Sequence, residues 1–113
     1  MRRVTYQRGD GTPRGGALID GDARIVDLAE AQAALSREAA PGNVLAIVEG
    51  GDAALDRARE AVAKAPASAI VRRAEARLRA PIQPPPQMRD CLCFELHLKQ
   101  AFAASEAHGY AVP

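Results

Sequence analysis

The chain has 113 residues, and its 15 basic and 14 acidic side chains give a net charge of +1. That length suits one small domain, and the balanced charge without a basic tract gives nucleic-acid binding little support. No stretch approaches the roughly 20 apolar residues of a membrane-spanning helix, and no apolar run follows Arg2 and Arg3 as it would in a secretory signal. We therefore expect a cytoplasmic protein that binds neither membranes nor nucleic acids.

The apolar content predicts a thin core. Hydrophobic residues make up 48% of the chain, but aromatic residues make up only 4%. Much of the apolar content is alanine. Small domains bury a smaller fraction of their surface than large ones and are marginally stable alone. We therefore expect a homo-oligomer, or a partner domain on which this chain packs.

The first 28 residues favour a small antiparallel sheet. Residues 1–7 are rich in strand-forming side chains, and a loop follows at residues 9–13. Asp20-Gly21-Asp22 then lies between two apolar segments. This pattern is typical of a β-hairpin in which Gly21 takes a positive φ.

Two helices are predicted in the middle of the chain. Apolar residues at helical spacing indicate a first helix over Leu28–Ala39, which Pro41-Gly42-Asn43 ends. The five apolar residues Val44–Val48 fit either a short buried strand or the start of a buried helix. A second helix has Asp52 as its expected N-cap and ends before Pro66.

The second helix carries a favourable i,i+4 pair, Glu60 and Lys64. After this helix, two segments alternate weakly, as exposed or edge strands do: 69–73 and 76–80.

A proline-rich stretch, Pro81–Pro86, divides the chain. Such a sequence is extended and semi-rigid, and inside a folded chain it is more often a spacer than a ligand for proline-binding domains. We predict an N-terminal domain over residues 1–80, a linker over 81–87 and a helical segment over 88–113. The fold class is α+β, a small antiparallel sheet with two or three packed helices and a further helix after the linker.

The segment after the linker carries the candidate site. We expect a helix from Asp90 onward, with an apolar face and an i,i+4 ion pair between Glu95 and Lys99 on its far side. Asp90 and His97 are seven residues apart, two helical turns, so their side chains would point nearly the same way at the rim of that face. The pair fits the wall of a pocket, but Asp90 equally fits a helix cap and His97 a rim histidine. The apolar face comprises Cys91, Phe94, Leu98 and Phe102.

The only cysteines, Cys91 and Cys93, would point to different sides of a helix. We therefore do not expect them to bridge each other, and we expect reduced, buried or half-buried thiols. A thiol or metal site formed with His97 is disfavoured, because the three side chains do not share one helical face.

Seven short segments form a recognisable series: Met1–Tyr6, Gly16–Gly21, Ile25–Leu28, Gly51–Leu55, Leu78–Ile82, Met88–Asp90 and Phe94–His97. In their order and spacing, they resemble the N-terminal region of the fumarylacetoacetate hydrolase family over essentially the whole chain. In that family a small N-terminal α/β domain precedes a larger β-rich catalytic domain, which binds Mg²⁺, Ca²⁺ or Mn²⁺ and cleaves a carbon–carbon bond in a diketo acid. The resemblance implies that Asp90 is a metal ligand and His97 the general base, acting on a small oxo-acid substrate. Carboxylate oxygens suit hard divalent cations, and a neutral histidine can deprotonate water.

The family pattern is incomplete in these 113 residues. Its other metal ligands, a Glu-x-Glu pair and a further Asp, are not matched, and Gln100 stands where some relatives have a Glu. No substrate-binding Arg is evident between Lys99 and Pro113. We therefore expect the N-terminal portion of such an enzyme, truncated before its main catalytic domain and inactive alone. The alternative is a non-catalytic structural or interaction module that packs on a partner or self-associates through its last helix.

Overall fold

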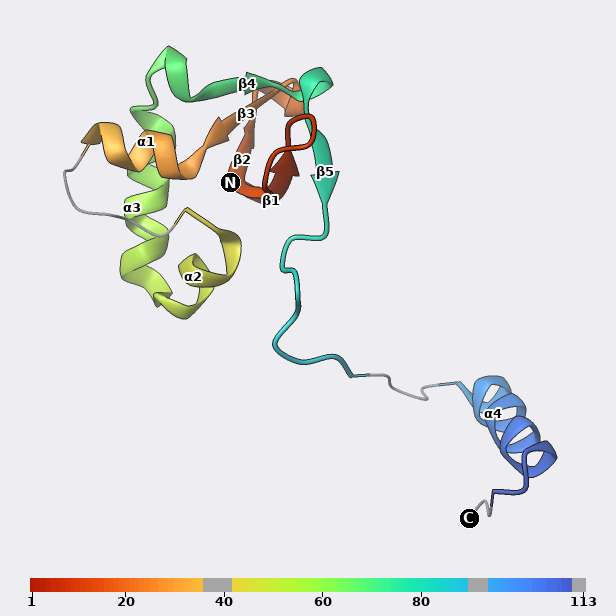
Figure 1. Ribbon diagram of the computed structural model, residues 1–113. Helices are drawn as coiled ribbons and strands as arrows, with labels where there is room; N and C mark the ends of the chain where they lie inside the picture. The colour runs from red at the N-terminus through yellow and green to blue at the C-terminus, as the bar shows by residue number, and fades with distance from the viewer. Residues whose placement is uncertain (36–41, 90–93, 111–113) are drawn as a thin grey trace.

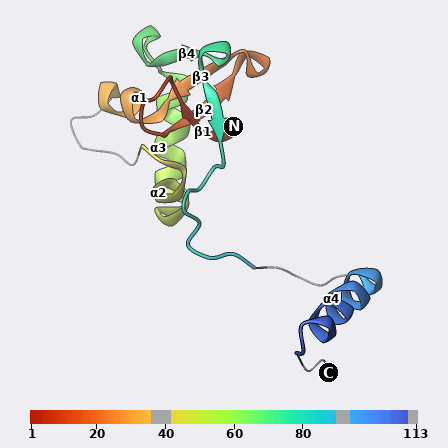
Figure 2. The same cartoon turned by 45° about the vertical axis from the view of Figure 1, so that its right-hand side comes forward.

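The computed structural model describes residues 1–35, 42–89 and 94–110. A five-stranded antiparallel sheet packs against three helices, and a fourth helix stands apart from them after an extended linker (Figures 1 and 2). The predicted α+β class, with a final helix after the proline-rich stretch, is confirmed.

The sheet has the strand order β4-β3-β2-β1-β5, and all neighbouring strands are antiparallel. The hairpin between β2 and β3 is confirmed, and Gly21 in its loop has a φ of 60°. The two weakly alternating segments form the two edge strands, also as predicted. The strands are β1 (Arg2–Gln7), β2 (Arg14–Ile19), β3 (Arg24–Asp27), β4 (Ile70–Arg72) and β5 (Arg77–Arg79). Short 3-10 turns occupy Asp20–Asp22, Ala67–Ala69 and Arg73–Glu75.

Helices α1 (Leu28–Leu35), α2 (Val44–Glu49) and α3 (Gly51–Ala63) cover one face of the sheet. The ambiguous segment after Asn43 is therefore helical, and the Asn43 side chain caps it by accepting a hydrogen bond from the Ala46 N–H at 2.8 Å. Residues 36–39 of the predicted first helix lie outside the described residues.

The prediction that Asp52 is the N-cap of α3 is wrong. Gly50 is at once the C-cap of α2 and the N-cap of α3, so Asp52 lies within the first turn. The two helices follow each other without a loop, which leaves no separate capping position for Asp52. Its carboxylate still lies near the positive end of the helix dipole. The predicted pair between Glu60 and Lys64 is confirmed, with Nζ and Oε1 2.7 Å apart.

The core has two parts, one on each face of the sheet. On the helix-bearing face Ala17, Leu28, Ile47 and Ala58 pack together, and on the other face Tyr6 and Ile25 pack with side chains from the edge strands. Seven of the fourteen buried hydrophobic residues in the described part of the chain are alanines. Each alanine removes little apolar surface from water, so the core is thin, as the composition predicts.

Helix α4 (Glu95–Ala107) begins five residues later than expected. Phe94 is its N-cap and has extended backbone, with φ −116° and ψ 134°. The prediction of one continuous helix from Asp90 is therefore wrong at Phe94. Glu95 instead opens the helix, where a carboxylate is favoured by the helix dipole, and it pairs with Lys99 at 2.5 Å as predicted.

Candidate functional site

The predicted catalytic histidine lies on α4. His97 is the third residue of this helix, and its side chain is exposed. Asp90, the predicted metal ligand, lies outside the described residues, as do Cys91 and Cys93. Two turns of one helix cannot align Asp90 with His97, as the spacing predicted, because the helix begins only after Phe94.

The described residues do not by themselves fit a divalent cation. Among residues 1–35, 42–89 and 94–110, no group of three or more His, Cys, Asp or Glu side chains could hold a metal ion. A hard cation needs several oxygen ligands at close range. The described residues around His97 do not supply such a cluster of carboxylates.

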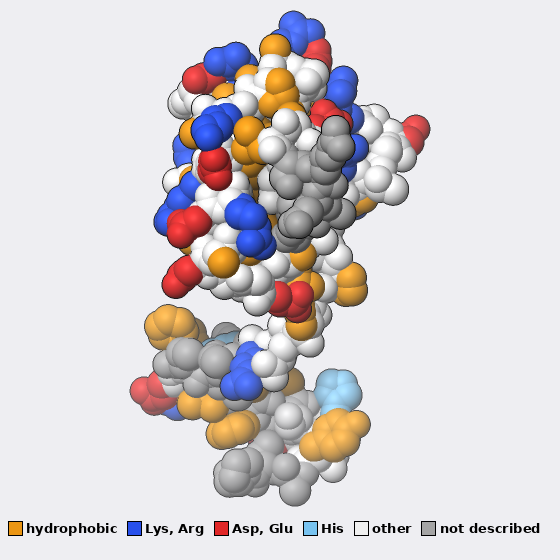
Figure 3. All heavy atoms as spheres, turned by 90° about the vertical axis from the view of Figure 1, so that its left-hand side faces the viewer, with side chains coloured by type: hydrophobic (Ala, Val, Ile, Leu, Met, Phe, Trp, Pro, Cys, Tyr) orange, Lys and Arg blue, Asp and Glu red, His pale blue; other side chains and the backbone are white. Residues whose placement is uncertain are grey.

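The C-terminal segment exposes several large apolar side chains. Phe94 and Leu96 are 74% and 66% exposed, and Met88 and Tyr110 are also largely exposed. Figure 3 shows hydrophobic side chains on the outside of this segment beside a few charged ones, and charged side chains of both signs interspersed over the face of the domain shown above it. Neighbouring apolar side chains at such exposure typically mark a surface that another protein element covers.

Among the residues of the domain that the structure describes, the carboxylate of Asp27 accepts four hydrogen bonds and is 1% exposed. The Tyr6 hydroxyl and Arg14 Nε each donate to its Oδ2 at 2.5 Å. Arg14 Nη2 and the Glu30 N–H donate to its Oδ1 at 3.0 and 2.8 Å. This carboxylate thus joins β1, β2, β3 and α1.

These contacts fix the ionisation of both buried groups. Burial alone would raise the pKa of Asp27, but hydrogen bonds from Arg14, Tyr6 and the Glu30 N–H outweigh burial and lower it. Burial, followed by the hydrogen bond to the Asp27 carboxylate, raises the pKa of Tyr6 well above its usual range. The carboxylate stays charged with four donors on it, and the phenol stays protonated. Neither group is placed to act as a base or a nucleophile, so we interpret the cluster as structural.

Gly16 makes room for the Tyr6 ring in this cluster. A Cβ at Gly16 would lie 2.5 Å from Ile25 Cγ2, closer than side chains allow, and 3.0 Å from Tyr6 Cδ1, tighter than most such contacts. The Tyr6 ring packs over the bare backbone of Gly16 and carries its hydroxyl to Asp27.

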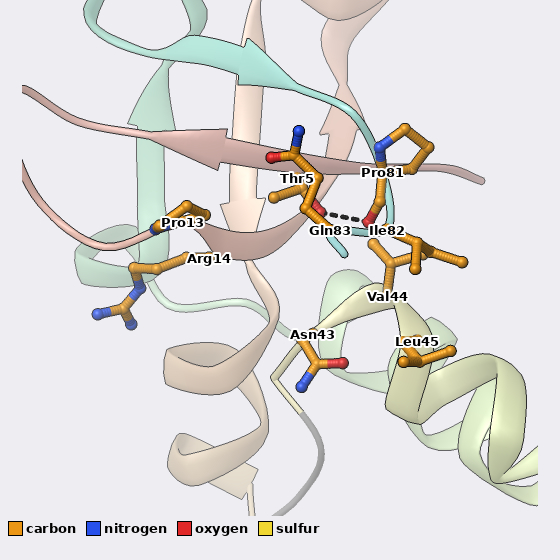
Figure 4. Close-up of a pocket in the computed structure, with 9 residues that line it drawn as sticks. All are labelled: Thr5, Pro13, Arg14, Asn43, Val44, Leu45, Pro81, Ile82 and Gln83. Carbon is orange, nitrogen blue, oxygen red and sulfur yellow. Dashed lines mark hydrogen bonds between the residues drawn. The ribbon is translucent and has the colours of Figure 1, made fainter. Parts of the chain in front are cut away.

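A cleft of about 250 Å³ lies where the linker leaves the domain (Figure 4). The Thr5 hydroxyl donates to the Pro81 carbonyl at 2.6 Å and ties the linker to β1. Figure 4 shows Arg14 turned away from the linker residues, and its guanidinium binds Asp27 and Glu30. The lining residues are Thr5, Pro13, Arg14, Asn43, Val44, Leu45, Pro81, Ile82 and Gln83.

The cleft and the buried carboxylate were not predicted from the sequence. Asp27 did carry a signal, because it directly precedes a helix and Glu30 follows three residues later, the spacing of a capping box. The cleft had no local signal, because its walls come from segments more than 70 residues apart.

Comparison with models of known protein families finds no match, and a search of curated proteins finds none either. Within the described part of the chain, no helix combines the length and the apolar character needed to cross a membrane.

Proposed function

We propose that this chain is the N-terminal portion of a cytoplasmic enzyme similar to the fumarylacetoacetate hydrolases. Such an enzyme hydrolyses a carbon–carbon bond in an acylpyruvate-like diketo acid with a divalent metal, Mg²⁺ or else Ca²⁺ or Mn²⁺. In this proposal His97 is the general base and Asp90 one metal ligand. The other ligands belong to a catalytic domain, and the chain alone is inactive.

The observation that carries the proposal is the exposure of apolar side chains at the start of α4. A helix bearing a histidine follows a proline-rich linker and presents Phe94 and Leu96 to solvent at 74% and 66% exposure. An α+β domain followed by such a helix is the arrangement expected if the helix belongs to a second, larger body. Within that body, Phe94 and Leu96 would be covered and His97 would face groups supplied by the catalytic domain.

The test uses the full-length gene product with an acylpyruvate and Mg²⁺. A general base contributes roughly 10²–10⁴-fold to a rate, so His97→Asn should lower kcat by about 100-fold or more. His108→Asn is the matched control, since His108 lies just after the same helix and is also exposed. Equal activity of the His97 and His108 variants would refute the assignment of the base.

The exposed apolar side chains also favour the alternative, a non-catalytic module that packs on a partner or forms a homo-oligomer. In this case the full-length product would turn over no oxo acid, while the molecule would associate through α4. Sedimentation of a dilute sample distinguishes the outcomes. A clean monomer of this chain, together with acylpyruvate cleavage by the full-length product, excludes the module.

A further inference from the structure

Three arginines occupy one face of the sheet at its β1–β5 end. In β1, Arg3 and Thr5 point to the same side because side chains alternate along a strand. Thr5 is the cross-strand partner of Arg79, and Gln7 is that of Arg77, so these side chains share that side. Arg3, Arg77 and Arg79 together are named the arginine face.

Within the described part of the chain, the arginine face lacks counter-charges. The side chains of its members make no hydrogen bond or ion pair with any described residue. Residues 1–9 and 77–89 contain no Asp or Glu, so neither strand nor the linker supplies one. By contrast, Arg2, Arg14, Arg24, Arg59 and Arg72 are all paired with carboxylates.

Arg79 adds a more specific observation. Arg79 as a whole is half-buried, but its Nε atom is buried and has no hydrogen-bond partner in the described structure. Buried donors in native proteins are nearly always bonded, and a buried donor left unbonded is costly. Arg3 is the diagonal cross-strand neighbour of Arg79, a position at about 7–8 Å. The positive charges of Arg3 and Arg79 therefore lie close to each other. The buried Nε is out of reach of an outside ligand, but Arg3 and Arg79 are each only half-buried. An anion that binds at the accessible parts of these two side chains relieves the repulsion between their like charges.

The neighbourhood of the arginine face indicates the chemistry of that anion. Thr5 belongs both to this row and to the cleft, whose walls include the apolar side chains of Val44, Leu45 and Ile82. A planar carboxylate matches the guanidinium fork in a bidentate pair, and the cleft beside it suits an apolar side chain. No aromatic side chain lies in this row for stacking of bases, which makes single-stranded nucleic acid a poor fit.

We propose that the arginine face binds a protein segment rich in carboxylate side chains and carrying an apolar residue next to them. Arg79 makes the central bidentate contact, and Arg3 assists it. This proposal does not depend on the enzymatic function, because it rests only on the pairing state of these arginines and the adjacent cleft.

The binding test uses the full chain and a fluorescent ten-residue peptide of glutamates with one central leucine. The peptide should bind in low salt, and the double substitution R3Q/R79Q should weaken binding by at least about tenfold. Arg57→Gln is the matched control, since Arg57 is exposed on α3 and not part of the arginine face. Equal losses in the R57Q variant and in the R3Q/R79Q variant, or equal binding of a peptide with glutamines in place of glutamates, would overturn the proposal. Tighter binding of a ten-nucleotide single-stranded DNA would also overturn it.

A stability measurement separates a binding role from a structural one. Since Arg79 has no partner to lose, Arg79→Met should leave the urea midpoint of unfolding unchanged or raise it. Arg14→Met, which removes a satisfied arginine, should lower the midpoint. A lowered midpoint for Arg79→Met would mean that Arg79 holds the fold together, and the proposal would fail. If R3Q/R79Q does not fold, Arg79→Lys keeps the charge but loses the fork and should still weaken peptide binding.

Discussion

The hydroxyl of Tyr6 should stabilise the domain, because it donates to a buried carboxylate. In Tyr6→Phe the ring stays packed over Gly16, while Asp27 loses one of its four donors. Both side chains are only 1% exposed, so solvent does not screen the interaction. A hydrogen bond to a charged group contributes roughly 1.5–3 kcal/mol, and we expect Tyr6→Phe to lower the free energy of unfolding by about 2 kcal/mol.

Urea unfolding followed by circular dichroism measures this loss. Tyr110→Phe is the matched control, because Tyr110 is 71% exposed and its substitution should not change stability. With an m-value of roughly 1–2 kcal/mol per M, the midpoint should fall on the order of 1–2 M. A loss below about 0.5 kcal/mol, within the usual range of surface substitutions, would refute the view that Asp27 organises the domain.

The same cluster predicts the pH dependence of stability. The pKa of Asp27 is lowered in the folded state, so its stabilisation is present above the unfolded value of about 4 and is lost as pH falls below that value. The pKa of Tyr6 is raised in the folded state, so stability should fall as pH rises above about 10, where only the unfolded tyrosine ionises. Tyr6→Phe should remove the alkaline loss contributed by this residue. An unchanged alkaline limb in Tyr6→Phe would contradict the assignment.

Three further substitutions test other parts of the account. Gly16→Ala would place a Cβ 2.5 Å from Ile25 Cγ2, and overpacking of this kind should cost about 1–3 kcal/mol in urea unfolding; a neutral result would mean that the Tyr6 packing is not tight. Asn43→Ala removes the cap of α2 and should cost about 1 kcal/mol by the same assay, whereas Asn43→Asp should retain most of it. The double substitution Phe94→Ser and Leu96→Ser should leave domain stability within about 0.5 kcal/mol, because both residues are exposed. The double substitution should also reduce light scattering at high concentration. A loss of domain stability would instead show that α4 packs on the domain.

The strands and the central hairpin could be predicted from local sequence, whereas the pairing of β3 with β4 and of β1 with β5 joins segments far apart in the chain. Gly21 in a short polar loop between two apolar segments specified the central hairpin, and weak alternation at residues 69–73 and 76–80 indicated edge strands. The helical state of residues 44–48 could not be decided, because a five-residue apolar run fits both periodicities. In the structure the Asn43 cap and the packing of Ile47 beneath the sheet favour the helix.

The site was harder to predict than the fold. The predicted alignment of Asp90 with His97 required an unbroken helix between them. Phe94 has extended backbone, so the helix is not continuous there. The arginine face depends on the pairing of β1 with β5, which are separated by about 70 residues of sequence. No local pattern reveals that Arg3 and Arg79 become neighbours.

The central claim is tested most directly by the products that the full-length gene product forms from a ¹³C-labelled acylpyruvate with Mg²⁺. Hydrolysis of the carbon–carbon bond consumes one water and yields one carboxylic acid and one pyruvate, both visible by NMR. We predict these two products in equal amounts, with their formation abolished by His97→Asn and retained in His108→Asn. Release of labelled carbon dioxide, or recovery of intact substrate from folded protein, would contradict the proposed hydrolase.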